Sequence, residues 1–459
     1  MAIKLALAHV VDSRTDFYEK RRPLAEEELS AVDWLREEYQ PLDSGLLCSN
    51  KAVAGFAEQA ARWGAQALVI HLPIWADPIF TVKLSNYLSV PILLLGNSRP
   101  ETSSLVGLLG AGGALDQIGR PHFRVFEHQS GEARNQVRAF INASAVIHTL
   151  RGQTLVLFGG RSLGIFTAVA DPAQWQRLFG VDIEYADQQE ISSRAEGLPA
   201  DDVSRAVQWL AGSLGSIRYE GAFTSRAFER QVRSYLSTKQ LAEQRGADFI
   251  GVKCQPELSD GYVTQCVSHM LMNGKIDADG GKDITVHACE SDADGALTMQ
   301  ILHLISGGKP AGLLDVRWYD PEEKLWTLAN CGALPAEFFH TGADPSGLSA
   351  IHMEPHIFGR GGGGALPAVV APQQVTLARL CRKNGHYWMA IVSGNTIHAN
   401  GAHNQMTTPA FPKAFVRSSA GTDFLNDFGS NHIHLVSGDY TQDLVAFCTL
   451  TGIDYKLWK

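Results

Sequence analysis

Mostly apolar runs alternate with amphipathic stretches along the first third of the chain. Residues 2–10, 67–72 and 90–95 form three such runs, and residues 51–63, between the first two, have apolar side chains at helical spacing. Strands that alternate with helices are typical of βαβ units, whose strands are parallel. The pattern therefore predicts a parallel-sheet α/β domain over residues 1–150.

The same rhythm returns after a long helical stretch at residues 131–150. Strand-like runs follow at residues 154–158, 182–185, 248–252, 283–289 and 311–316. We expect a second doubly wound parallel-sheet domain over residues 151–320.

The last third of the chain has a different pattern. Its strand-like segments are short and are broken by Gly, Pro and Asn, including the tract GRGGGGALP at residues 359–367. This pattern is typical of antiparallel barrels and sandwiches. We therefore predict a mostly antiparallel, β-barrel-like C-terminal domain over residues 321–459, which completes an α/β protein of three domains.

Charge and hydropathy exclude two classes of partner. The chain has 39 basic and 48 acidic residues, a net charge of -9, and no basic block of the kind that binds nucleic acid. No apolar stretch approaches the roughly 20 residues that span a membrane. These features predict a cytoplasmic protein whose partner is a small molecule.

The cysteines do not form a recognisable framework. They are odd in number and never occur as Cys-x-x-Cys, so neither disulfides nor a thiolate zinc site is expected. Buried small apolar side chains explain them, at Cys48, Cys254, Cys266, Cys289, Cys331, Cys381 and Cys448.

A glycine-rich turn follows the predicted strand at residues 154–158. Gly160 to Gly164 matches G-x-S-x-G, in which Ser162 would be an exposed acyl nucleophile. An ordinary strand-to-helix turn has the same composition. No Asp and His follow in hydrolase order, so the turn is the favoured interpretation. The segment does not match G-x-G-x-x-G either, which disfavours a dehydrogenase.

Three carboxylates, at Glu290, Asp292 and Asp294, stand where an apolar strand gives way to a helix. Asp292 and Asp294 occupy positions where acids cap and stabilise a helix N-terminus. Glu290 falls at the carboxyl end of the strand, the edge where open α/β sheets bind ligands. We expect Glu290 to have the chemical role and the other two a structural one.

Asp315 ends the apolar part of another predicted strand. Two strand-end carboxylates in one sheet are able to converge on a divalent cation or to act as an acid/base pair. A plain ion pair between Asp315 and Arg317 remains an alternative. His432 and His434 alternate along a strand and face one side of it, which suits metal ligands and satisfied core histidines alike.

Four motifs together resemble the L-fucose isomerase family of aldose–ketose isomerases and, more distantly, the L-arabinose isomerases. They are GVKCQ ending at Gln255, ACESD with GALTM around Glu290, LDVR around Asp315, and Asn431-His432 followed by Gly438. The resemblance implies that Glu290, Asp315 and His432, rather than His434, bind a metal, and that the two carboxylates are catalytic. It also implies that Gln255 and Asn431 contact the substrate.

Two residues of the first domain carry weaker matches. Arg14, in VVDSRTDFY, resembles an arginine that reaches the substrate, and Trp75, in HLPIWADP, resembles an aromatic residue lent to a neighbouring subunit's site. A surface ion pair and a packed loop aromatic are their alternatives. The resemblance further implies Mn²⁺, with Mg²⁺ or Co²⁺ as substitutes, and a homo-oligomer, the family's usual form being a hexamer with its sites between subunits.

The expected activity is isomerisation of a monosaccharide through an ene-diol, with L-fucose or D-arabinose as the default substrate. The sugar pocket departs from the family, because Ile357-Phe358-Gly359-Arg360-Gly361 replaces Tyr-Phe-Arg-Gly and no tryptophan precedes Asn431. Phe411 and Phe415 are the only aromatic residues near that place, and Asp439 stands where histidine is usual.

These departures leave two other functions open. An anionic sugar such as sulfoquinovose fits the extra arginines Arg161, Arg360 and Arg417, since guanidinium groups suit sulfonate. A non-catalytic sugar-binding or sensing protein is the alternative from another class.

Overall fold

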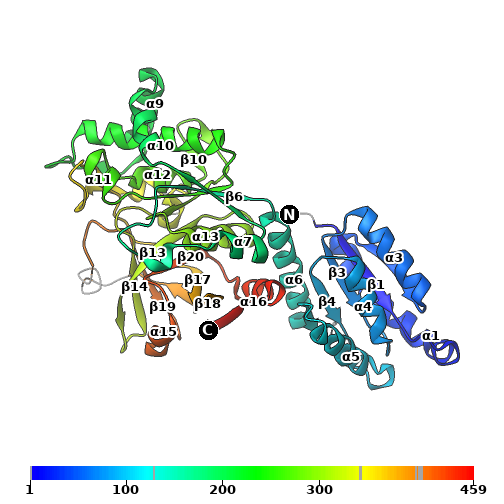
Figure 1. Cartoon of the computed structure of the whole chain (residues 1–459). Coiled ribbons are helices and arrows are strands. Elements are labelled where there is room, and N and C mark those ends of the chain that lie inside the picture. Colours follow the sequence, from blue (N-terminus) through cyan, green and yellow to red (C-terminus); the bar gives the residue numbers. More distant parts are fainter. Residues whose placement is uncertain (1–2, 128–129, 341–343, 399–400, 402–406, 459) are drawn as a thin grey trace. The chain divides into compact units, whose positions relative to one another are not determined.

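The computed structural model describes residues 3–127, 130–340, 344–398, 401 and 407–458 (Figure 1). The chain divides into two compact units. The first contains Met1–Leu150 and Gln442–Asp454, and the second contains Arg151–Thr441 and Tyr455–Lys459. No helix in the described residues is both long and apolar enough to cross a membrane.

The first unit is built on a parallel sheet with helices on both faces. The strands lie in the order β2-β1-β3-β4-β5 and are β1 (Leu5–Val10), β2 (Leu42–Leu47), β3 (Ala67–His71), β4 (Ile92–Leu95) and β5 (Phe123–Val125). The helices are α1 (Thr15–Ser30), α2 (Asp33–Tyr39), α3 (Asn50–Trp63), α4 (Pro78–Tyr87), α5 (Ser104–Gln117), α6 (Gly131–Leu150) and α16 (Thr441–Thr451).

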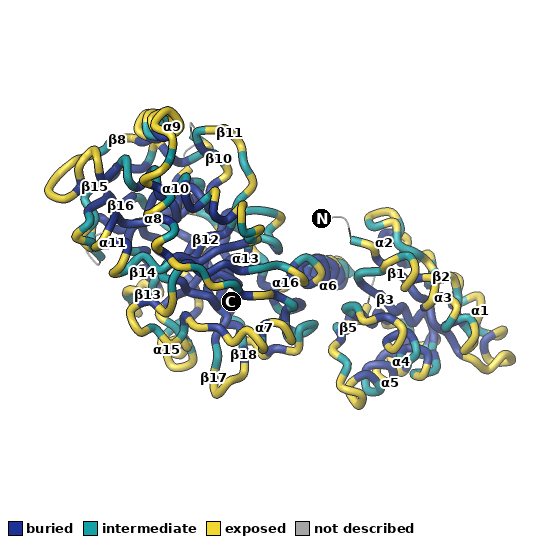
Figure 2. The backbone as a smooth tube through the Cα atoms, turned by 45° about the horizontal axis from the view of Figure 1, so that its top comes forward, coloured by how far each residue is buried: buried dark blue, intermediate teal, exposed yellow. Residues whose placement is uncertain are grey.

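Alternate residues of β1 supply both faces of this sheet. Ala6 and Ala8 pack in one core cluster with α3, α4 and α5, whereas Leu5 and Leu7 pack in another with α2 and α6. Because both faces are covered, the three central strands β1, β3 and β4 are buried throughout (Figure 2), as their apolar sequences predict, whereas the edge strands β2 and β5 contain exposed residues.

The second unit contains a smaller parallel sheet. Its order is β12-β9-β6-β7, with β6 (Thr154–Phe158), β7 (Asp182–Ala186), β9 (Phe249–Val252) and β12 (Val286–Cys289). Its longer helices are α7 (Pro172–Leu178), α8 (Gln189–Glu196), α9 (Ala200–Ser213), α10 (Ser225–Gln244), α12 (Cys266–Met272) and α13 (Ala293–Ile305). Parallel sheets in both predicted α/β regions are therefore confirmed.

The second unit also contains a seven-stranded sheet. Its order is β17-β20-β13-β14-β19-β18-β21, with β13 (Ala311–Asp320), β14 (Leu325–Ala329), β17 (Gln374–Lys383), β18 (His386–Thr396), β19 (Lys413–Arg417), β20 (His432–Ser437) and β21 (Asp454–Trp458). Strand β17 also pairs with β18, so the antiparallel pairings run from β17 through β20, β13, β14, β19 and β18 and back to β17.

Strand β13 does not belong to the parallel sheet. Glu290 and Asp315 were expected in one sheet, but β13 pairs with β14 and β20 in the seven-stranded sheet, so this expectation is wrong. An apolar run of this length suits a buried strand in either kind of sheet, so its pattern does not reveal the partner. The buried helix α13 contacts strands of both sheets and holds them together.

Candidate metal and sugar site

A tight turn positions Glu290. Strand β12 ends at Cys289, and Glu290 and Ser291 then adopt left-handed φ angles of 60° and 51°. Asp292 begins α13, and its Oδ1 accepts a hydrogen bond of 2.9 Å from Gly295 N. Glu290 therefore stands at the carboxyl end of a parallel strand, and Asp292 caps the helix, as the sequence predicts.

Asp315 and His432 are direct cross-strand partners in the pairing of β13 with β20. His432 Nε2 lies 3.3 Å from Glu290 Oε2 and 3.6 Å from Asp315 Oδ1. The imidazole is buried, with 1% of its side chain exposed, while the two carboxylates retain 14% and 21%. The structure thus brings the three expected metal ligands together from two different sheets.

The second nitrogen of His432 contacts a carboxylate that the sequence analysis gave only a capping role. His432 Nδ1 lies 2.7 Å from Asp292 Oδ2. Arg379 Nη1 and Nη2 donate to Asp292 at 2.5 and 3.0 Å, and Arg379 Nη2 also donates to Thr167 O. Asp292 and Arg379 are both buried. They form a second layer behind His432, on the side away from Glu290 and Asp315.

The charges of this cluster shift the pKa values of its own side chains. Burial disfavours the charge on His432, but the carboxylates of Asp292 and Glu290 outweigh burial and raise the pKa of His432 to about 10. Burial also opposes ionisation of Asp292, yet Arg379 and His432 hold its pKa well below the usual range. Burial raises the pKa of Asp315, with His432 and Arg317 acting in the opposite direction.

The donor set suits a hard divalent cation. Two carboxylates and one imidazole converge, and the remaining imidazole nitrogen is bonded to a carboxylate, as is usual for metal-binding histidines. Across the described ranges, no three His, Cys, Asp or Glu side chains are close enough to form a preformed metal cage. His432 Nε2, Glu290 and Asp315 would hold such a cation, and its binding would compete with a proton on His432 Nε2.

Two neighbours restrain Asp315. Arg317 Nη2 donates to its Oδ2 at 2.9 Å, and Asn431 Nδ2 donates to its Oδ1 at 3.3 Å. The ion pair considered from the sequence is therefore present beside the contact with His432. Asn431, expected at the substrate, contacts the candidate metal ligand Asp315.

Gln255 lies just beyond β9. Its Nε2 is 3.8 Å from Cys331 Sγ, and its backbone oxygen accepts a hydrogen bond from Ser162 Oγ at 3.3 Å. Ser162 is fully buried. A buried hydroxyl that donates to a backbone carbonyl is not an exposed nucleophile, so the hydrolase alternative is wrong.

Arg14 and Trp75 lie together in the first unit. The Arg14 guanidinium makes two hydrogen bonds to Asp12, at 2.9 and 2.7 Å, and lies 4.9 Å from the Trp75 ring centre. Phe17 flanks the guanidinium at 4.4 Å. An ion pair of Arg14 was the alternative expected from the sequence, and it is present here between the exposed Arg14 and the buried Asp12.

The other candidates lie outside the cluster. His434 is buried and its Nδ1 lies 3.3 Å from Ala378 O, whereas Asp294 accepts a hydrogen bond from Tyr387 at 2.6 Å. Arg360, with 91% of its side chain exposed, is 3.8 Å from Asp260, and Arg417 pairs with Glu323 at 3.6 Å. All seven cysteines are free.

Comparison with known proteins agrees with the resemblance. Residues 328–459 match the family described as L-fucose isomerase, C-terminal domain. The sulfoquinovose isomerase of Priestia megaterium is 21% identical over 448 residues, which cover 93% of this chain and 94% of that protein. The sulfoquinovose isomerase of Alkalicoccus urumqiensis is 20% identical and matches 82% of this chain and 83% of that protein.

The L-fucose isomerase of Haemophilus influenzae is 22% identical over 317 residues, which cover 60% of this chain and 53% of that protein. The relationship to these sugar isomerases, inferred from four short motifs, is thereby confirmed.

Proposed function

We propose that this relative of the sulfoquinovose and L-fucose isomerases is a metal-dependent aldose–ketose isomerase, with Glu290, Asp315 and His432 as the metal ligands. The observation that carries the proposal is the position of His432 Nε2, within 3.3 and 3.6 Å of the two carboxylates. Mn²⁺ suits two oxygen ligands and one imidazole, and Mg²⁺ or Co²⁺ are the substitutes.

The reaction moves a proton between C1 and C2 of the sugar through an ene-diol. A bound divalent cation supplies polarisation of the carbonyl and compensates the developing negative charge. Glu290 and Asp315 are the proposed acid and base, because both carboxylates reach the same space beside His432. Positioned proton transfer of this kind contributes about 10²- to 10⁴-fold. Gln255 and Asn431 are the proposed hydrogen-bond partners of the sugar hydroxyls.

We propose sulfoquinovose, or a sugar of that anionic class, as the first candidate substrate. The support is coverage: the match to a sulfoquinovose isomerase spans 94% of that protein, whereas the match to an L-fucose isomerase spans 53% of it. L-fucose and D-arabinose are the second candidate class, favoured by the match of residues 328–459 to the L-fucose isomerase C-terminal domain.

Arg14 and Trp75 are proposed substrate contacts, and Trp75 is proposed to serve the site of a neighbouring subunit in a homo-oligomer. Their support is the cluster that they form in the first unit, where a guanidinium lies against two aromatic rings.

A conversion assay tests the function. The protein is incubated with sulfoquinovose, L-fucose, D-arabinose or L-arabinose, with Mn²⁺ or with EDTA, and the ketose is measured. We expect ketose from sulfoquinovose with Mn²⁺ and none with EDTA. Ketose from L-fucose alone would select the second substrate class. Sugar binding without any conversion, in a protein that binds Mn²⁺, would contradict the isomerase and favour a sensor.

A further inference from the structure

An anionic sugar of the proposed class needs a cationic side chain that is free to bind its charged group. The three arginines considered from the sequence do not meet this need. Arg360 and Arg417 already lie near carboxylates, at 3.8 and 3.6 Å, and Arg161 lies 4.6 Å from the ring centre of Phe166. All three are exposed, so water and salt weaken their attraction to an anion.

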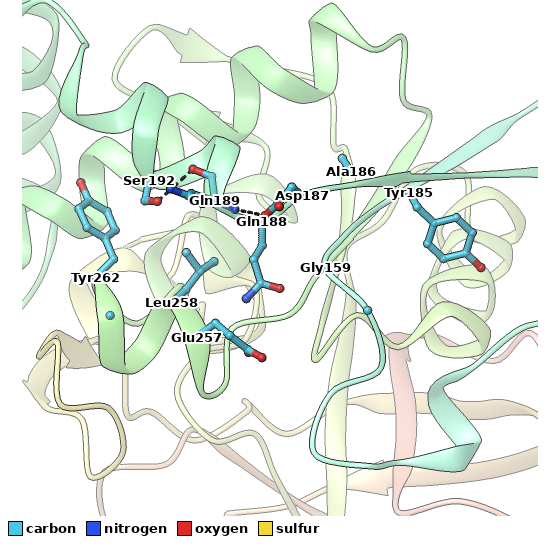
Figure 3. A pocket seen from close by; sticks show the side chains of 12 residues that line it. Gly159, Tyr185, Ala186, Asp187, Gln188, Gln189, Ser192, Glu257, Leu258 and Tyr262 are labelled. Carbon is cyan, nitrogen blue, oxygen red and sulfur yellow. Dashed lines mark hydrogen bonds between the residues drawn. The ribbon is translucent and has the colours of Figure 1, made fainter.

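The cavity at the carboxyl ends of β6 and β7 does not supply such a cation either (Figure 3). Its volume is about 740 Å³, and none of its described lining residues is Lys or Arg. Its two acids are Asp187 and Glu257, and Glu257 is already paired with Lys253. Because carboxylates repel a sulfonate or phosphate group, this cavity is not the anion site.

Lys413, at the start of β19, is the only lysine in the described chain that is buried, with 5% of the residue exposed. No hydrogen bond or ion pair joins its ammonium group to a described residue, and burial alone lowers its pKa. Its Nζ is still not completely enclosed by protein atoms. A buried ammonium group is unfavourable unless an anion compensates it. Lys413 therefore carries a positive charge that this chain leaves uncompensated and that a ligand is able to reach.

Lys413 stands in one cross-strand row with two of the proposed metal ligands. His432 of β20 pairs with Asp315 of β13, and Asp315 pairs with Ala329 of β14. Ala329 pairs in turn with Lys413. Directly paired residues of antiparallel strands point to the same face of a sheet, so Lys413 shares a face with Asp315 and His432. Two strand spacings, roughly 10 Å, separate Lys413 from Asp315.

Side-chain contacts lead from Asp315 toward the start of β19. Arg317 donates to Asp315 at 2.9 Å, and its guanidinium lies 5.2 Å from the ring centre of Phe411. Phe411 precedes Lys413 by two residues and packs against Phe358, with ring centres 6.1 Å apart. The start of β19 therefore borders the proposed site. Lys413 is nevertheless too far from Asp315 to take part in the proton transfer, which requires hydrogen-bond distance.

This separation suits recognition of the far end of a sugar. When C1 and C2 of a hexose lie beside the metal ligands, C6 is the carbon farthest from them. A lysine two strands away meets a substituent on C6 and leaves the reacting carbons alone. Its ammonium group binds a sulfonate or a phosphate as a compact point charge.

We propose that Lys413 is a specificity-determining residue that binds an anionic group on C6 of the sugar, an inference that rests on the proposed isomerase function. The ammonium group donates hydrogen bonds to the anion's oxygens, while Glu290 and Asp315 act at C1 and C2. A sulfonate and a phosphate ester both present this chemistry.

Kinetics with three matched sugars test this role. Sulfoquinovose, glucose 6-phosphate and 6-deoxy-D-glucose share one configuration and differ only at C6, where the last has no charge. We expect Lys413→Met to lower kcat/KM for the preferred anionic sugar about 10- to 100-fold, mainly through KM. Conversion of 6-deoxy-D-glucose should change by less than about twofold. Lys413→Arg should regain part of the loss, because it keeps the positive charge.

Two further measurements separate this role from a structural one. Arg417→Met is the matched control, since Arg417 lies four residues further along β19, on the same face, but is near Glu323. It should leave the kinetics of all three sugars unchanged. Lys413→Met should not lower the melting temperature, because it replaces a buried charge without a partner by an apolar side chain of similar length. A lower melting temperature with unchanged kinetics would assign Lys413 to structure alone.

Calorimetric titration with the same sugars and Mn²⁺ separates this proposal from the isomerase. If no sugar is converted, weaker binding of an anionic sugar by Lys413→Met still supports the anion site. If only neutral sugars are converted, the isomerase stands and the anion site is wrong. The proposal is also overturned by equal binding of sulfoquinovose, glucose 6-phosphate and 6-deoxy-D-glucose, or by wild-type affinity for the anionic sugar in Lys413→Met.

Discussion

The imidazole of His432 is bonded to Asp292 through Nδ1, at 2.7 Å from Oδ2, while its Nε2 faces Glu290 and Asp315. A carboxylate on one imidazole nitrogen fixes the tautomer and makes the other nitrogen a better ligand. Asp292 therefore has a positioning role beyond the helix cap that its sequence position predicts.

Asp292→Asn should weaken Mn²⁺ binding about 10- to 100-fold. The amide no longer compensates the positive charge on the metal-bound imidazole. Mn²⁺ affinity, measured by electron paramagnetic resonance of the free ion, checks this result. Asp294→Asn is the matched control, because Asp294 is equally buried in α13 but contacts Tyr387 and Trp175 instead of His432.

The same substitution leaves Arg379 as a buried charge without its carboxylate, so we expect a loss of about 3–5 kcal/mol in the free energy of unfolding. Affinity must be compared at a temperature where the variant is folded. Wild-type Mn²⁺ affinity in a folded Asp292→Asn protein would contradict the positioning role.

Glu290→Gln should reduce kcat by at least about 10²-fold while the protein stays folded. The amide neither transfers the proton nor matches the charge of a divalent cation. Glu322→Gln, at an exposed acid in the turn after β13, is the control and should keep full activity. Full activity of Glu290→Gln in the conversion assay would refute the assigned site.

Ser162→Ala should retain isomerase activity within about threefold. The substitution removes one hydrogen bond to Gln255 O, worth about 1 kcal/mol, and leaves the carboxylates in place. A loss of activity comparable to that of Glu290→Gln would instead revive Ser162 as a chemical participant.

Stability should fall as the pH drops below about 6.5. His269 and His287 are fully buried with their Nδ1 atoms 3.0 Å apart. Burial lowers the pKa of His269 to about 4 and that of His287 well below its usual range. The unfolded chain therefore binds more protons than the folded chain between pH 6.5 and 4, and each histidine reduces stability by about 1.4 kcal/mol per pH unit there. Above pH 6.5 both histidines are neutral in the folded and in the unfolded chain, so they no longer reduce the free energy of unfolding there.

Urea denaturation at pH 7 and pH 5 measures this slope. A His287→Asn variant should show a smaller slope than the wild type. His386→Asn, at an exposed position of β18, should leave the slope unchanged. An equal slope in His287→Asn and the wild type would rule out the buried pair as its source.

The proposal that sites are shared between subunits predicts complementation. Trp75→Ala and Glu290→Gln homo-oligomers should each be weakly active, because every site lacks one contribution. Subunits mixed by co-expression should regain part of the activity, since some sites then combine an intact first unit with an intact Glu290. Activity of the mixture equal to the mean of the two homo-oligomers would show that each chain completes its own site.

The sequence predicted the parts of this site that depend on local signals. An apolar strand followed by helix-capping acids placed Glu290 at the carboxyl end of β12. The alternation in β20 left His432 and His434 as equal candidates, and only the family motifs selected His432. The pairing of β13 with β20 could not be predicted, because hydrophobic patterning defines a strand and not its partner. In the sequence, Arg379 is only a charged residue inside an apolar strand, and this pattern does not predict its contact with Asp292.

The turn at Glu290 and Ser291 bears on the engineering of this protein. Both residues hold left-handed φ angles that cost non-glycine residues about 1–3 kcal/mol each. Ser291→Gly should relieve part of that strain and raise the melting temperature without touching the carboxylates. At Glu290 the same relief would remove the functional group itself. The backbone strain at Ser291 can therefore be removed to raise the melting temperature. The strain at Glu290 must remain in any active version of the chain, because only the glutamate side chain supplies the carboxylate.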